Sequence, residues 1–157
     1  MPERQIEILL VEDNDDDVEL TLHALRKENL ANSIQVARDG EEALEFLFCN
    51  GNHADRVSAP PPKLVLLDLK LPKVDGLEVL RRLKGNPKTM TIPVVILTSS
   101  KEERDLIISY GLGANSYIQK PVDFEQFRET VKSVGLYWLL INQAPVATAA
   151  TKSAGQS

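Results

Sequence analysis

The sequence predicts an α/β fold with a central parallel sheet. Short runs rich in Val, Ile and Leu, with little alternation between apolar and polar residues, are typical of strands that are buried on both faces. Segments with helical spacing of apolar residues lie between these runs, and strands that alternate with helices form right-handed crossovers. Each run stops at polar residues that can take part in chemistry. The runs are Ile8–Val11 before Glu12 and Asp13, Leu64–Leu67 before Asp68, Val94–Leu97 before Thr98, and Tyr117–Ile118 before Gln119 and Lys120.

The first half of the chain is expected to contain a strand, a helix, a second strand and a second helix. The acidic stretch 13–17 favours a helix N-terminus, where carboxylates interact well with the helix dipole, and apolar residues recur after it at helical spacing. Alternating polarity over 33–37 indicates the second strand, and Asp39–Gly40 then opens a helix that runs to Phe48. The segment 50–63 contains a glycine and three consecutive prolines, which predicts a loop longer than most connections.

The second half of the chain repeats this alternation. Glycine, proline and small polar residues mark the boundaries, because they cap helices or stop them. The strand at 64–67 is followed by a turn at Pro72 and by a helix that begins at Asp75–Gly76. The other expected boundaries are a helix stop at 85–87, a strand over 93–97, a helix cap at Ser99 or Ser100, a helix end at Gly111 or Gly113, a strand over 115–119, and a last helix with an apolar stripe from Phe124 to Val134.

The last helix is expected to end in an apolar stretch, residues 136–141. A helix that lies on a sheet cannot bury its whole circumference, so this stretch should contact a partner or a second copy of the chain, or fold back onto its own domain. The expected interface residues are Tyr137, Trp138, Leu140 and Ile141. Residues 142–157 have too little apolar surface to fold alone and are interpreted as a flexible tail.

Length and composition limit the function classes. With 157 residues, of which 43% are hydrophobic, the chain is expected to fold as one domain over 5–141. The net charge of −5 and the lack of a Lys/Arg block argue against nucleic-acid binding. The single cysteine, Cys49, excludes an internal disulfide and a cysteine-ligated metal cluster. Because the sequence has neither a secretory signal pattern nor an apolar run of about 18 residues, we expect a soluble, cytoplasmic protein with no membrane contact.

The residues after the strands combine into one chemical site. Glu12, Asp13 and Asp68 should lie at the carboxyl ends of neighbouring strands, where open α/β sheets bind their ligands. Carboxylates this close repel each other, and a divalent cation with oxygen ligands, Mg²⁺ in particular, relieves the repulsion. Lys120 adds a positive charge and Thr98 a hydroxyl, which are the groups needed to bind phosphoryl oxygens. The set therefore favours an aspartyl phosphate on Asp68.

Four short motifs coincide with these predicted strand ends. They are Val11–Asn14, Leu67–Pro72 with Asp75–Gly76, Leu97–Ser99, and Lys120–Pro121. Together they resemble the signature of the receiver domains of two-component response regulators. The resemblance covers about residues 5–135 and implies a flavodoxin-like (CheY-like) doubly wound sheet, with five parallel strands in the order 2-1-3-4-5 and five helices.

The resemblance also implies the phosphoacceptor and the metal ligands. By it, Asp68 accepts a phosphoryl group from a sensor histidine kinase, with Mg²⁺ as the cofactor. Asp13 and Asp68 are implied as ligands of the metal, with Glu12 acting mainly through water. The backbone carbonyl of Lys70 is implied as a further ligand.

The resemblance also implies phosphoryl-binding residues and two switch residues, Thr98 and Tyr117, on the last two strands. Thr98 and Lys120 would bind the phosphoryl group, and Tyr117 would change rotamer when Thr98 moves toward the phosphate. The bond between Lys120 and Pro121 is implied to be cis. Phosphorylation would thus alter the face of the fourth helix, the fifth strand and the fifth helix.

A narrower set of features is similar to the single-domain regulators that are paired with bacterial phytochromes. The features are the Pro-rich loop before the third strand, Ser109–Tyr110, Ala114–Asn115, Lys120–Asp123 and Tyr137–Leu139. This resemblance implies a phytochrome-type histidine kinase as the partner, and a homodimer. The downstream partner is left unidentified.

Other functions are weighed against a receiver domain. A phosphatase or phosphotransferase with an aspartyl nucleophile usually needs a second carboxylate two residues after the nucleophile, where this chain has Lys70. A nucleotide-binding domain is disfavoured because no G-x-x-x-x-G-K-[ST] loop is present. A binding-only receiver is disfavoured because every position of the phosphorylation site is filled. An intermediate phosphocarrier in a phosphorelay remains an alternative.

Overall fold

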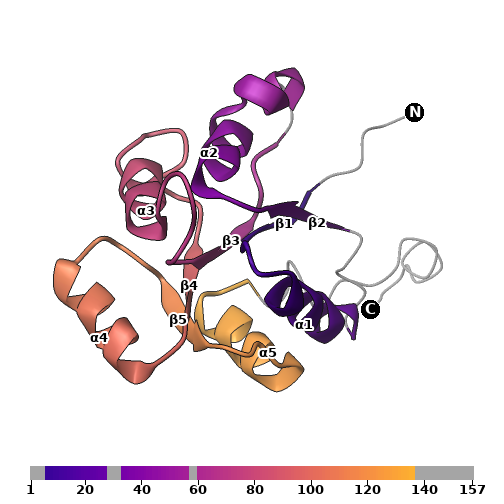
Figure 1. Cartoon of the computed structure of the whole chain (residues 1–157), viewed down its shortest axis with the longest axis vertical. Helices are drawn as coiled ribbons and strands as arrows, with labels where there is room; N and C mark the ends of the chain where they lie inside the picture. The colour runs from indigo at the N-terminus through magenta and orange to yellow at the C-terminus, as the bar shows by residue number, and fades with distance from the viewer. Residues whose placement is uncertain (1–5, 28–32, 57–59, 137–157) are drawn as a thin grey trace, which may run out of the picture.

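The protein is an α/β domain with helices on both faces of one parallel sheet (Figure 1). The structure is a computed structural model that describes residues 6–27, 33–56 and 60–136. The strands are β1 (Ile8–Val11), β2 (Ile34–Ala37), β3 (Leu64–Asp68), β4 (Val94–Thr98) and β5 (Ser116–Gln119), and the α-helices of the described residues are α1 (Asp15–Arg26), α2 (Gly40–Phe48), α3 (Gly76–Lys84), α4 (Lys101–Tyr110) and α5 (Phe124–Ser133). The strand order is β2-β1-β3-β4-β5, which confirms the predicted fold.

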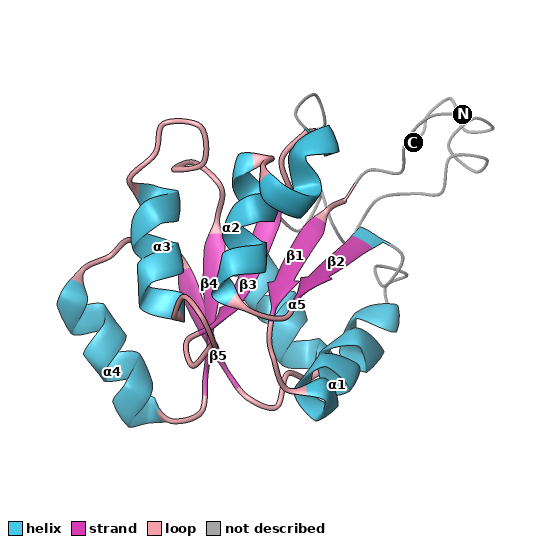
Figure 2. Ribbon diagram, turned by 45° about the horizontal axis from the view of Figure 1, so that its top comes forward, coloured by secondary structure: helices cyan, strands magenta, loops and turns pink. Residues whose placement is uncertain are grey.

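The sheet is buried on both faces, as the apolar runs predict. Alternate residues of each inner strand enter two separate cores, because successive side chains of a strand point to opposite faces. On β1, Leu9 and Val11 pack with α2 and α3, whereas Ile8 and Leu10 pack with α1 and α5. Figure 2 shows these two helical layers on either side of the strands. Within the described ranges, no helix is long and apolar enough to cross a membrane.

Each of these five helices begins with a short polar residue that caps it. The side-chain oxygen of each cap accepts a hydrogen bond from the backbone N–H three residues later, which satisfies one free donor of the first turn. The caps are Asn14, Asp39, Asp75, Ser100 and Asp123. Because each cap follows the carboxyl end of a strand, the strand-to-helix turns all gather at one edge of the sheet.

The loop predicted over 50–63 is partly helical, which corrects the prediction. A 3₁₀-helix, η2, spans Gly51–Arg56. The Arg56 guanidinium carbon lies 3.5 Å from the centre of the Phe46 ring, and Arg56 donates a hydrogen bond to the Phe46 carbonyl oxygen at 2.6 Å. These contacts join η2 to α2, and they could not be predicted because two short 3₁₀ turns, separated by a kink at His53, leave no apolar periodicity in the sequence.

The last helix ends earlier than the sequence suggested. α5 stops at Ser133, and Gly135 has a φ of +83°, a left-handed conformation that glycine adopts without strain. The N–H of Leu136 donates to the Val131 carbonyl oxygen at 3.0 Å, so the helix ends in a Schellman motif. Within the described residues, α5 therefore ends before Gly135. Leu136 itself packs in the core with α1 and α5, and the predicted interface residues Tyr137, Trp138, Leu140 and Ile141 and the tail 142–157 lie outside the described residues.

Candidate functional site

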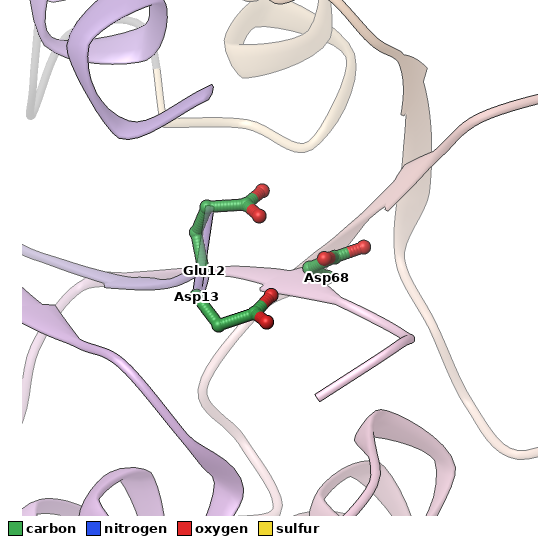
Figure 3. Close-up of side chains that lie close together, drawn as sticks. All are labelled: Glu12, Asp13 and Asp68. Carbon is green, nitrogen blue, oxygen red and sulfur yellow. The ribbon is translucent and has the colours of Figure 1, made fainter. Parts of the chain in front are cut away.

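Three carboxylates meet at the carboxyl edge of β1 and β3. One oxygen from each of Glu12, Asp13 and Asp68 lies within 4.8 Å of the others. Figure 3 shows the three side chains gathered at the ends of the two strands. Glu12 and Asp68 are buried, whereas Asp13 is exposed, so the cluster opens toward solvent on one side. Two buried carboxylates and one exposed carboxylate, with no nitrogen or sulfur ligand in the group, suit a hard divalent cation that also keeps bound waters.

Burial and charge repulsion make the ionised form of the Glu12 carboxyl unfavourable. Burial and the neighbouring charge of Asp68 raise the pKa of Glu12 to about 7, although Lys120 and a hydrogen bond from the backbone N–H of Asn14 act in the opposite direction. A carboxyl with so high a pKa is half protonated near neutral pH. A bound divalent cation would favour its ionised form and lower that pKa.

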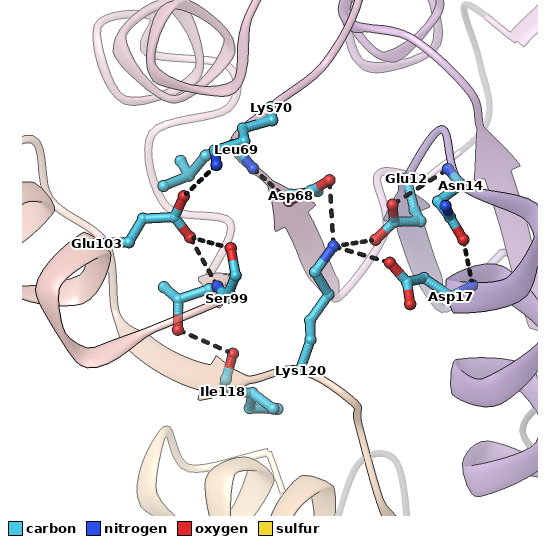
Figure 4. A network of polar contacts seen from close by, with 11 residues as sticks. Glu12, Asn14, Asp17, Asp68, Leu69, Lys70, Ser99, Glu103, Ile118 and Lys120 are labelled. Carbon is cyan, nitrogen blue, oxygen red and sulfur yellow. Dashed lines mark hydrogen bonds and ion pairs between the residues drawn. The ribbon is translucent and has the colours of Figure 1, made fainter.

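Lys120 reaches into the carboxylate cluster from the end of β5 (Figure 4). Its ammonium nitrogen lies 3.0 Å from Asp17 Oδ2, 3.3 Å from Glu12 Oε1 and 3.4 Å from Asp68 Oδ2. Burial would lower the pKa of Lys120, but the hydrogen bond to Asp17 and the charges of Asp68 and Glu12 outweigh it and raise this pKa. The ammonium is therefore charged, and it lies where it can neutralise a phosphoryl oxygen on Asp68.

Sequence reasoning missed Asp17 as a member of this site. We assigned the acidic stretch 13–17 to the helix N-terminus, and the structure places Asp17 in the first turn of α1 with its N–H donating to the cap Asn14. The same position turns its carboxylate toward Lys120. The sequence shows that Asp17 lies three residues after the cap Asn14, in the first turn of the helix. Only the fold shows that Lys120 lies opposite the Asp17 carboxylate.

The turn after β3 holds the Asp68 carboxylate in place. Its Oδ1 accepts a hydrogen bond from the backbone N–H of Leu69 at 2.8 Å, while Oδ2 faces Lys120. The start of α3 lies directly behind this turn, since a Cβ on Gly76 would come within 2.4 Å of the Asp68 carbonyl oxygen. Glycine is thus required at position 76 for the helix to approach this closely. The Lys70 side chain points outward and is 81% exposed, and the metal role of its carbonyl stays a prediction.

The two expected switch residues lie on β4 and β5. Asp68 pairs with Leu97 across the two strands, so Thr98 is one residue beyond the partner of the phosphoacceptor. The buried hydroxyl of Thr98 donates to the Ile118 carbonyl oxygen at 3.4 Å. Tyr117 is partly buried against the core on the α2 and α3 side, and its burial raises the pKa of its hydroxyl. The Lys120–Pro121 peptide bond is cis in the structure.

Comparison with known families identifies the domain. The family model described as "Response regulator receiver domain" matches residues 8–132, which include β1 to β5 and every residue of the site. The chain belongs to this receiver-domain family. Phosphoryl transfer from a histidine kinase to an aspartate is the general role of this family.

The most similar relatives include regulators linked to phytochromes. Response regulator Rcp1 of Synechocystis is 39% identical over 140 residues, covering 89% of this chain and 93% of its own. A probable methanogenesis regulatory protein, FilR2 of Methanothrix harundinacea, is 41% identical over 138 residues, covering 88% of this chain and 86% of its own. The structure of the bacteriophytochrome response regulator AtBRR is 54% identical with a TM-score of 0.81, covering 90% of this chain and all of that one. The receiver therefore has phytochrome-associated relatives.

A divalent metal has been observed in one of these relatives. A structure of Rcp1 is described as its Mn²⁺-bound form, with 36% identity, a TM-score of 0.67, and coverage of 89% of this chain and 97% of that one. Together with the cluster of Glu12, Asp13 and Asp68, this likeness supports divalent metal binding by the receiver.

Proposed function

We propose that the protein is a response regulator that accepts a phosphoryl group on Asp68 from a sensor histidine kinase. The observation that carries the proposal is the position of the Asp68 carboxylate, which lies close both to the ammonium of Lys120 and to the carboxylates of Glu12 and Asp13. A carboxylate oxygen of Asp68 forms a bond to phosphorus while the phosphorus–nitrogen bond of a phosphohistidine breaks, and the electron pair of that bond stays on the imidazole. The product is an acyl phosphate.

The residues around Asp68 have separate roles in this transfer. We propose that Asp13, Asp68, the carbonyl of Lys70 and, through water, Glu12 hold Mg²⁺, which would neutralise charge on the transferring oxygens. Lys120 supplies a fixed positive charge 3.4 Å from Asp68 Oδ2. Its contact with Asp17 keeps it directed toward the carboxylate cluster.

The response to phosphorylation is proposed to begin at Thr98. Its hydroxyl would leave the Ile118 carbonyl and donate to a phosphoryl oxygen, and Tyr117 would turn into the space that is freed. This is a population shift between two arrangements of the face formed by α4, β5 and α5. We propose that the chain acts as a phosphoacceptor and does not turn over small phosphate esters, since the exposed Lys70 stands where such an enzyme needs a carboxylate.

The likeness to AtBRR, which is described as a bacteriophytochrome response regulator, supports a phytochrome-type histidine kinase as the phosphodonor. We propose that the receiver unit spans 5–141, that residues 142–157 form a flexible tail, and that the protein acts in the cytoplasm. A downstream protein would read the altered face. Incubation with a phosphorylated phytochrome-type kinase domain and an unrelated one tests the pairing, which fails if both donate at the same rate.

A homodimer is proposed through the apolar stretch after α5, with Tyr137, Trp138, Leu140 and Ile141 as its contacts. Because Leu136 packs in the core, a truncation that tests this should keep residue 136. Mass in solution, measured by light scattering, should be that of a dimer for the full chain and of a monomer for residues 1–136. A full-length monomer at working concentration would contradict the dimer.

Intact-mass spectrometry tests the phosphoacceptor. Incubation with a small acyl phosphate should add one phosphoryl group when Mg²⁺ is present and none when it is chelated. Asp68→Asn should abolish the adduct, while Asp105→Asn, on the exposed surface of α4, should leave it unchanged. An adduct that persists in Asp68→Asn would refute the assignment.

A further inference from the structure

A glutamate on α4 holds the segment next to Thr98. Glu103 Oε1 accepts two hydrogen bonds from Ser99, one from its backbone N–H at 2.7 Å and one from its hydroxyl at 3.2 Å (Figure 4). Its second oxygen, Oε2, lies 3.9 Å from the ammonium of Lys70, on the turn after β3. Glu103 thereby connects the turn that follows the phosphoacceptor to the turn that follows Thr98.

The position of Glu103 is fixed by its helix. Its own N–H donates to the hydroxyl of the cap Ser100 at 3.1 Å, so the residue occupies the third position of the first turn of α4. Its side chain is only 15% exposed, which limits competition from water for the two bonds to Ser99. Hydrogen bonds to an ionised acceptor are shorter and stronger than neutral ones, as the distance of 2.7 Å reflects.

The contact is coupled to Thr98 through the backbone. The Ser99 N–H that Glu103 accepts belongs to the peptide group that joins Thr98 to Ser99, and this group is planar and rigid. A movement of the Thr98 main chain toward Asp68 therefore displaces the donor. Glu103 cannot follow unless the start of α4 also moves, since the cap anchors it.

We infer that Glu103 is a positioning residue that holds the Thr98–Ser99 segment away from the phosphoryl group and so opposes activation. This inference rests on the proposed function. It states that a side chain on α4 shifts the equilibrium between the two arrangements of the Thr98–Ser99 segment. The side chain does not touch the phosphoryl group; it acts through Ser99. Removing it weakens only the arrangement in which Thr98 donates to Ile118, and the protein then spends more time ready to bind phosphate.

Binding of beryllofluoride, a stable mimic of the phosphoryl group, measures that balance. In the presence of Mg²⁺, calorimetric titration of Glu103→Ala should give about tenfold tighter binding than the wild-type chain, because two hydrogen bonds of the opposing arrangement are lost. Glu103→Gln should bind with an affinity between those of the wild type and Glu103→Ala, since its amide oxygen can accept both bonds from Ser99 but lacks the charge that strengthens them. Ser99→Ala removes only the hydroxyl bond and should tighten binding by a smaller factor in the same direction.

Glu102→Ala is the matched control, because Glu102 is an exposed glutamate in the same helical turn. It should leave the affinity unchanged, and thermal unfolding of each variant verifies that α4 is intact. Equal or weaker binding by Glu103→Ala, or tighter binding by Glu103→Gln to the same extent as by Glu103→Ala, would overturn the role of Glu103 while leaving the proposed function in place. Absence of binding by the wild-type chain would overturn both.

Discussion

The raised pKa of Glu12 predicts an unusual dependence of stability on pH. Replacing Glu12 with Gln substitutes a neutral side chain of the same shape for a carboxyl that is half protonated near pH 7 in the folded protein. Between its reference pKa of 4.5 and about 7, the folded protein binds more protons at this carboxyl than the unfolded chain does. The contribution of Glu12 to stability therefore falls as pH rises through this window. The Glu12→Gln variant should lack this fall in stability, because its amide side chain does not titrate.

The magnitude follows from the size of the shift. Each pKa unit corresponds to about 1.4 kcal/mol, and the shift from 4.5 to about 7 gives a total of about 3 kcal/mol. The side chain is fully buried, so solvent screening does not reduce this figure appreciably. Between about pH 5 and about pH 8, the free energy of unfolding of the wild type should fall by about 2 to 3 kcal/mol relative to that of Glu12→Gln.

Urea unfolding across this pH range, with metal removed by a chelator, measures the difference. Glu125→Gln, at an exposed site in the first turn of α5, is the matched control for the loss of one carboxylate. Added Mg²⁺ should stabilise the wild type more than Glu12→Gln, because the metal favours the ionised carboxyl. A stability difference between wild type and Glu12→Gln that stays constant from about pH 5 to about pH 8 would refute the assignment of a raised pKa to Glu12.

Two further variants test how the site is built. Asp17→Asn should lower the free energy of unfolding by about 1 to 2 kcal/mol more than Asp16→Asn in urea titrations. The reason is that Asp17 bonds to the mostly buried Lys120, whereas Asp16 is exposed. Equal losses would contradict a role for Asp17 in holding Lys120. Gly76→Ala should lower the free energy of unfolding by at least about 2 kcal/mol in the same assay and reduce phosphorylation of Asp68. The reason is that the alanine Cβ would collide with the turn after β3. Wild-type stability and labelling would show that this turn is not tightly enclosed.

Most of the site could be predicted because of where parallel strands end. Once 8–11 and 64–68 are identified as strands, Glu12 and Asp68 must meet at one edge of the sheet, and Lys120 follows from the last strand by the same reasoning. Asp17 and Glu103 could not be found in this way. Both lie in first helical turns, where acidic residues are common for local reasons, and their contacts depend on how each helix is oriented toward the neighbouring strand ends.

The errors in the fold have a similar origin. The helix η2 depends on the contact between Phe46 and Arg56, which lie ten positions apart in the sequence and leave no periodic signal. The end of α5 did have a signal, a glycine followed by a leucine, which is typical of a Schellman motif. The continuous apolar run after Gly135 favours a longer helix, but the local pattern at Gly135 determines where the helix ends.

The most direct test of the central claim is to locate the phosphoryl group on the chain. Borohydride reduces an aspartyl phosphate to homoserine, so reduction after labelling with an acyl phosphate and Mg²⁺, followed by peptide mass spectrometry, marks the acceptor. Phosphorylation of Asp68 should give homoserine at position 68 alone. Homoserine at position 13 or 17, or labelling of a side chain other than an aspartate, would contradict it.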